Sequence, residues 1–130
     1  MRLKLNPLLD SAEIRLLTEV GFLAAAKADV GRAKVIFSSL ELLRPNGAFV
    51  YSGLAFAYLN AARYEDGVTV LDRGLQHMAA EDVPVLQSIR AMALGWAGRA
   101  SESTRALALA GTHPLAEILR TPTTLQHKEN

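Results

Sequence analysis

The chain has 130 residues, half of them hydrophobic, with a formal net charge of +1 and no cysteine. A chain of this length forms one domain and can bury a core without cross-links. The near-neutral charge, with neither a basic stripe nor an aromatic platform, argues against nucleic-acid binding, and the lack of cysteine excludes disulfides and thiolate metal sites.

The segment before the first predicted helix predicts neither a signal peptide nor a membrane span. It carries Arg2 and Lys4, and Asp10 and Glu13 then interrupt the apolar run. Asp10, followed three residues later by Glu13, instead predicts a capping box at the start of a helix. From residue 14 to residue 24 this helix is apolar on more than one face, so we expect it to pack on two sides.

Five further helices and a terminal cap follow in the chain. Pro45 ends the second helix, because its ring disfavours the helical conformation of the residue before it. Asp82 ahead of Pro84 marks the start of the fifth helix, and Ser101 is predicted to be the N-cap of the sixth. The first predicted helix follows a cap at Asp10 or Ser11 and ends before a turn over 28–31. The next are 33–43, 48–61, 64–77 and 85–96, and the sixth runs from the Ser101 cap to about residue 110, before a short covering helix over 114–120. Residues 121–130 are polar and are predicted to be disordered.

A repeat with a fixed period organises the chain between residues 14 and 79. Small, small, large apolar and small residues occur in this order and recur 34 residues later. The first set is Gly21, Ala33, Phe37 and Pro45, and the second is Ala55, Gly67, Leu71 and Ala79. Small residues allow two helices to cross closely, and such a period is typical of stacked helical pairs. A third, degenerate unit requires a two-residue insertion near Ala80, with Ser103 as its small residue and Leu107 as its apolar one.

These positions resemble the tetratricopeptide repeat (TPR) family, whose period is about 34 residues. The second unit carries the family's first-helix motif as Tyr51-x-x-Leu54-Ala55-x-x-Tyr58, whereas Ala24 stands where the family usually has tyrosine. The resemblance implies an all-α, TPR-like right-handed superhelix of three helix-turn-helix repeats with a short capping helix. The repeats would span about 14–47, 48–81 and 84–113, with the cap at 114–120, in a single domain over residues 1–120.

The resemblance also implies that the first helix of each repeat lines a concave face. It places Phe22, Phe56 and Met92 at one equivalent position, facing an apolar groove. The groove residues expected to contact a partner are Phe22, Ala26, Phe49, Ser52, Phe56, Leu59, Asn60, Val85, Ile89, Met92 and Trp96. Aromatic and methionine side chains suit an amphipathic helix laid into such a groove. The alternative is that the aromatic residues are ordinary core, covered by the chain's own termini.

The polar residues show no pattern typical of catalysis. The three histidines lie far apart in the sequence, without partners at ligand spacing. The neighbouring acids Glu65 and Asp66 lie in the first turn of a helix, where the helix dipole favours negative charge. We therefore expect a protein that is not an enzyme and that uses no cofactor or metal.

In size, repeat number and groove character, the chain resembles the small chaperones of bacterial type III secretion. The likeness implies a cytoplasmic virulence chaperone that holds an amphipathic helix of a secretion subunit until export. One alternative is a TPR assembly adaptor or scaffold that retains its partner. The other is a self-associating structural component, a homo-oligomer whose groove binds a second copy. In each case the expected partner is a protein or peptide, with no nucleic acid and no membrane insertion.

Overall fold

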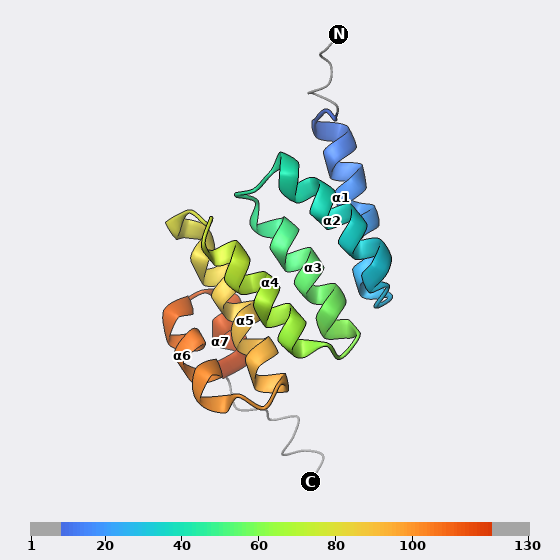
Figure 1. Ribbon diagram of the computed structural model, residues 1–130. Helices are drawn as coiled ribbons and strands as arrows, with labels where there is room; N and C mark the ends of the chain where they lie inside the picture. The colour runs from blue at the N-terminus through green and yellow to red at the C-terminus, as the bar shows by residue number, and fades with distance from the viewer. Residues whose placement is uncertain (1–8, 121–130) are drawn as a thin grey trace.

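Helices account for the regular secondary structure of the computed structural model, which describes residues 9–120 (Figure 1). They are α1 (Ser11–Ala26), α2 (Val30–Leu43), α3 (Ala48–Asn60), α4 (Tyr64–Leu75), the 3₁₀ turn η1 (Ala80–Asp82), α5 (Val83–Trp96), α6 (Ala100–Ala110) and α7 (Pro114–Arg120). No strand occurs in this part of the chain, and the predicted all-α class is confirmed. The tail over 121–130, predicted to be disordered, lies outside the described residues.

The three helical hairpins turn in the same way. Ala28, Ala62 and Gly98 adopt left-handed backbone conformations, with φ of 59°, 61° and 82°. After each of them, the N–H of the next residue donates to the carbonyl oxygen five residues before that next residue, at 2.8–2.9 Å. This is the bond of a Schellman turn. The turn positions are 34 and then 36 residues apart, and η1 lies at Ala80–Asp82, where the two extra residues were predicted.

Glycine at the first two turns is expected to stabilise the fold. An alanine pays a steric cost of about 1 kcal/mol in the left-handed region, and glycine does not. Ala28→Gly and Ala62→Gly should therefore each raise the free energy of unfolding by roughly 0.5–1 kcal/mol, and Gly98→Ala should lower it by a similar amount. Denaturant titration followed by circular dichroism measures both changes. A loss of stability in Ala62→Gly would contradict the left-handed geometry at that turn.

The helices pack in chain order and also across the hairpins. Each of α1 to α6 contacts the next, and in addition α1 contacts α3, α3 contacts α5 and α5 contacts α7. The first helices of successive hairpins are therefore neighbours in one row (Figure 1). Helix α7 contacts α5 and α6, so it covers this end of the array, as was predicted for residues 114–120.

The small residues lie where helices approach most closely. Phe37 of α2 is fully buried, and its ring contacts glycines on both neighbouring helices. A Cβ on Gly21 of α1 would lie 2.8 Å from Phe37 Cζ, and a Cβ on Gly53 of α3 would overlap the same ring. At the α3–α4 crossing, a Cβ on Gly67 would lie 3.1 Å from Leu59 Cδ2. The interpretation of these small residues as crossing points agrees with the packing.

Two helix starts differ from the prediction because the Schellman turns are short. Helix α6 begins at Ala100 with Arg99 at its N-cap, so the prediction of Ser101 as N-cap is wrong. Helix α2 begins at Val30 rather than residue 33, and the Asp29 carboxylate caps it by accepting the Arg32 N–H at 3.1 Å. In both hairpins only the N-cap residue separates the left-handed residue from the next helix, which leaves no room for the longer turns expected.

The other ends follow the sequence more closely. The predicted capping box is confirmed: Asp10 Oδ1 accepts the Glu13 N–H at 2.8 Å, and Glu13 Oε1 accepts the Asp10 N–H at 2.9 Å. Helix α2 ends at Leu43, just before the Arg44–Pro45 step. Helix α5 starts at Val83 and α4 stops at Leu75, each two residues before its predicted limit.

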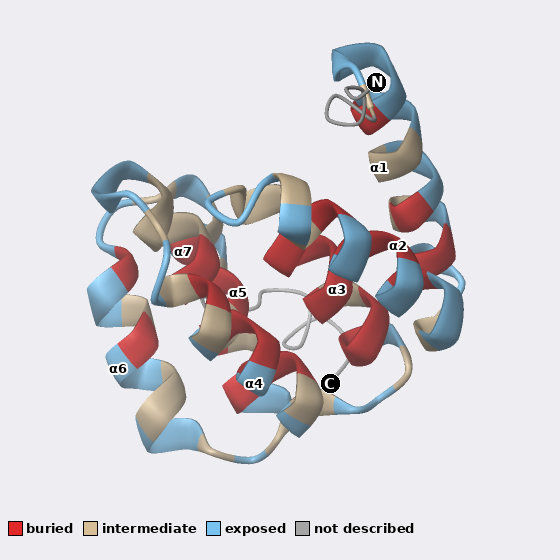
Figure 2. Cartoon of the chain, turned by 45° about the horizontal axis from the view of Figure 1, so that its top comes forward, coloured by how far each residue is buried: buried red, intermediate tan, exposed pale blue. Residues whose placement is uncertain are grey.

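Helix α1 is covered by other helices less completely than its apolar composition predicts. Buried residues dominate α3, whereas much of α1 is exposed (Figure 2). Leu16, Val20 and Leu23 are exposed on α1, so among the described residues nothing covers the second apolar face. Helix α1 does pack against both α2 and α3, but the side that carries these three residues has no neighbour in the described part of the chain, because α1 is the first helix of the row.

Candidate functional site

The three repeated positions of the candidate groove have the same setting. Phe22 of α1, Phe56 of α3 and Met92 of α5 each lie six residues before the left-handed residue of their hairpin. All three side chains are half-buried and pack against the core. The Phe22 ring meets Phe37 edge-on, with ring centroids 5.2 Å apart and planes at 79°. Each first helix thus offers one partly exposed apolar side chain at the same register.

Three candidate residues lie in the core. Ser52, Leu59 and Ile89 are buried, and Leu59 fills the α3–α4 crossing beside Gly67. They were expected on the groove-lining side of their helices, but the neighbouring helices cover them. We therefore leave these three residues out of the proposed contact surface.

Asn60 has a structural role at the edge of this face. Its Nδ2 donates to the Ala25 carbonyl oxygen at 2.9 Å and so joins the last turns of α1 and α3. Ala26 beside it is exposed, and Val85, in the first turn of α5, is half-buried. The Asn60 bond therefore joins α1 to α3, and Ala26 adds only a small side chain to this face.

Trp96, at the end of α5, is the most exposed aromatic side chain of the candidate set, at 55 %. Its ring lies 5.8 Å from that of Tyr64, with the planes tilted by 53°. It borders a hollow of about 240 Å³ that α5, α6 and α7 share, where it is joined by Met92 and by Leu107 and Leu119. The walls of this hollow are mainly apolar side chains. Trp96 and Met92 therefore line the same hollow, and residues of α6 and α7 form its other walls.

Sequence reasoning missed the partners of Trp96. The sequence indicates Leu107 only through the repeat pattern, Leu119 only as part of the cap, and position 64 only as the start of a helix. Trp96 also borders a second hollow, of about 340 Å³, formed with Tyr64 and the turn at residues 62–66. The apolar spacing of α7 could have indicated Leu119 as an inward-facing residue.

The other end of the row holds a hollow of different character. Phe49, in the first turn of α3, faces the first half of α1 and Arg44 across a space of about 370 Å³. Arg15 and Glu19 of α1 also border this space and pair with each other at 3.4 Å. Apolar and charged side chains are mixed here, whereas the hollow beside Trp96 is mainly apolar.

Ionisable groups with shifted pKa values lie outside the candidate set, none of whose members is ionisable. A hydrogen bond from Arg99 lowers the pKa of the Glu102 carboxyl, and Arg99 Nη1 also contacts Glu65 Oε1 at 2.6 Å. Burial raises the pKa of Tyr51, whose hydroxyl donates to the Pro45 carbonyl oxygen at 2.8 Å. These contacts tie α3 to the preceding loop and α4 to α6, and they stabilise the array rather than form a reactive centre.

The other polar candidates are engaged in the fold. Asp66 Oδ2 accepts a bond from Arg63 Nε at 2.8 Å, and His113 Nδ1 accepts the Leu115 N–H at 3.1 Å. Within residues 9–120, no three histidine or acidic side chains gather as a metal ion would require. Over the same range, every helix is too short or too polar to cross a membrane.

Comparison with known proteins gives no further assignment: no family model, curated protein or solved structure matches this chain.

Proposed function

We propose that the chain is a non-catalytic binding module that holds an amphipathic helix of a partner protein along the row α1–α3–α5. The observation that carries this proposal is the repetition of a half-buried apolar side chain, Phe22, Phe56 or Met92, at the same register of three successive hairpins. A helix presents apolar side chains at regular intervals along one face, so a row of evenly repeated apolar positions suits it.

The proposed contact surface is the subset of candidates with exposed area. Trp96 and Met92, which line the apolar hollow, would bind one end of the partner helix most strongly. A large aromatic side chain and a flexible thioether both pack well against an apolar partner. Phe56 and Phe22 would extend the contact along the row, and Phe49 would lie at its other end.

Within this class, we propose a TPR-like chaperone of the cytoplasm that shields a type III secretion subunit before export. The support is the resemblance of the repeat motifs and the apolar nature of the exposed candidate residues. A subunit that polymerises or enters a membrane exposes an apolar helix, and burying that helix until handover keeps it from aggregating.

The single tryptophan gives a direct test, because Trp96 lies within the proposed surface. The partner is first isolated with the full chain from the native cell and identified by mass spectrometry. Adding the purified partner should then shift the emission of Trp96 to the blue, because the half-exposed indole becomes buried. Calorimetry should show a negative heat-capacity change of binding.

Two variants and a matched control locate the contact. Trp96→Ala should weaken binding by about ten-fold or more, with little change in melting temperature, since more than half of the side chain is already exposed. Met92→Glu should weaken binding similarly. Leu42→Glu, on an 86 % exposed position of α2, should bind as the unmodified chain does. Unchanged Trp96 emission when the partner is added to the unmodified chain, together with unchanged affinity in both variants, would contradict the proposed surface.

A further inference from the structure

The outer face of α1 carries an exposed apolar stripe. Leu16, Val20 and Leu23 are exposed to 62 %, 40 % and 62 %. Their spacings of four and three residues place them on one side of the helix. Phe22 lies two residues after Val20 and therefore nearly opposite to it around the helix. The stripe is thus separate from the row of residues proposed above to bind a partner helix.

In the next hairpin, the equivalent side of the first helix is buried. Moving 34 residues along the chain gives Val50, Leu54 and Ala57 of α3, which are exposed to only 1 %, 3 % and 0 %. They are covered because α3 packs against both α1 and α2. In α5 the corresponding first and last positions, Leu86 and Ala93, are also fully buried. The same side of α1 has no such cover in the described residues.

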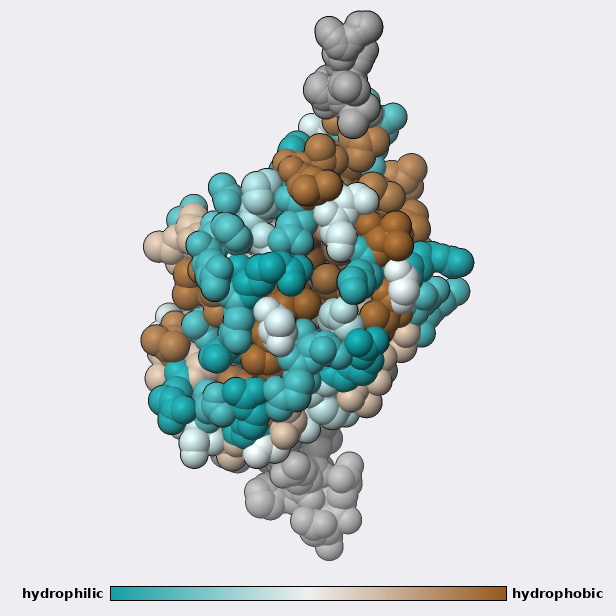
Figure 3. Space-filling model, in the orientation of Figure 1, coloured by the Kyte–Doolittle hydropathy of each residue, from teal (hydrophilic) through white to brown (hydrophobic). Residues whose placement is uncertain are grey.

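Hydrophobic side chains gather around α1 and α2 at the upper part of the molecule in Figure 3. Arrays of helical pairs need a polar outer face at their ends to avoid association. Three apolar side chains with large exposed areas on one line of α1 do not meet this requirement. An exposed stripe of this kind therefore marks an interaction surface.

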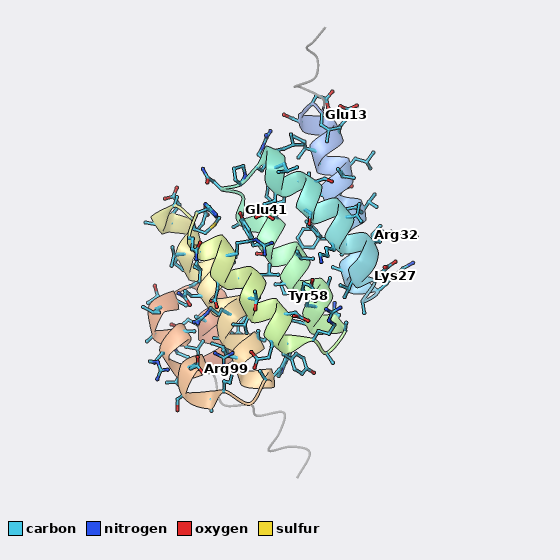
Figure 4. All side chains as sticks on the ribbon, viewed as in Figure 1. Glu13, Lys27, Arg32, Glu41, Tyr58 and Arg99 are labelled. Atoms are coloured by element: carbon cyan, nitrogen blue, oxygen red, sulfur yellow. The ribbon has the colours of Figure 1, made fainter. Side chains whose placement is uncertain are left out.

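Charged residues at the two ends of the stripe indicate which kind of partner would bind to it. Glu13 and Lys27 continue the same line of α1, three residues before Leu16 and four after Leu23. Figure 4 shows Glu13 at one end of α1, and Lys27, with Arg32 nearby, at the other. The line therefore carries an acid at its amino end and a base at its carboxyl end, which is complementary to the same line running in the opposite direction.

We propose that the occupant is a second copy of this chain, with the two α1 helices packed antiparallel about a twofold axis at Val20. Leu16 of each copy then lies opposite Leu23 of the other, and Glu13 lies opposite Lys27. Glu13 Oε1 caps its own helix, and the second carboxylate oxygen accepts from the lysine. A parallel arrangement would instead place like charges together. The antiparallel interface is isologous and closes as a dimer.

The dimer leaves the row α1–α3–α5 accessible, so this inference does not rest on the proposed function. It also differs from self-association through the groove, which would bury Trp96. Trp96 emission should therefore stay unchanged over the concentration range in which the dimer forms.

Sedimentation velocity on the full chain, with charge-reversed variants, tests the register. The unmodified chain should show a concentration-dependent shift from monomer to dimer. Glu13→Lys alone and Lys27→Glu alone should each raise the dimer dissociation constant by about ten-fold, because each puts like charges together at two symmetric contacts. An equimolar mixture of the two variants should restore association, because both contacts become attractive again.

A single introduced cysteine provides a second test that does not depend on the capping residue Glu13. The chain has no cysteine of its own, so Val20→Cys places one thiol per copy at the proposed axis. It should form a covalent dimer readily under mild oxidation, whereas Leu42→Cys on α2 should remain monomeric. A monomeric mass at every concentration, as a cover from the chain's own residues 1–8 would give, would overturn the proposal. Equal cross-linking of both cysteine variants would also overturn it.

Discussion

Phe37→Ala is expected to lower the free energy of unfolding by about 3–5 kcal/mol, because it removes a large side chain from a fully buried site. The ring lies between Gly21 and Gly53 and also meets Phe22 edge-on. Neither glycine has a side chain that could move into the space left behind. The variant therefore loses the free energy of transferring the ring from water to the core. It also loses the packing contacts around the ring, because the neighbouring helices cannot refill the cavity.

Denaturant titration followed by circular dichroism measures this loss. Leu42→Ala is the matched control, since Leu42 lies on the same helix but is 86 % exposed. It should stay within about 0.5 kcal/mol of the unmodified chain. A change below about 1 kcal/mol in Phe37→Ala would show that the first hairpin does not pack on α3 through this ring.

Gly53→Ala is expected to destabilise the fold by about 2–3 kcal/mol, although the same exchange in an open helix gains up to about 1 kcal/mol. The added Cβ would overlap the Phe37 ring and lie 2.5 Å from its Cε1 atom. Because the ring is fully buried, it cannot swing aside, and α2 and α3 must separate.

Two further variants isolate the cause of that loss. Gly95→Ala in α5 should be neutral or stabilising, since its new Cβ would meet only Ser103 Oγ at 3.5 Å. In the Phe37→Ala background, Gly53→Ala should cost little, because the added methyl enters the vacated space. Additive losses in that double variant would contradict a direct clash between the two positions.

The sequence predicts the repeat well because the constraints are local or steric. Close helix crossings need small residues, and Gly21 and Gly67 lie at such crossings in the structure. The capping box of Asp10 and Glu13 depends on only four consecutive residues, and it forms as expected. Pro45 likewise limits α2 through its own ring.

The turns and the candidate site were harder to predict, for physical reasons. Ser101 is a good capping residue in isolation, but the Schellman turn fixes the helix start two residues earlier. The family resemblance placed Leu59 and Ile89 on the groove-lining face, but it does not show how closely the neighbouring helices cover them. The surroundings of Trp96 depend on α6 and α7, where the repeat pattern is weakest.

The exposed outer face of α1 has a consequence for how such an array can grow. The equivalent side of α3 packs on the α1–α2 hairpin. A second copy of a hairpin, fused ahead of α1, could therefore pack on the exposed face of α1 in the same way. Lengthening by tandem duplication would therefore require little new sequence at the junction. The added hairpin would bury the apolar stripe. The longer array would then have one more repeat but could no longer dimerise through α1.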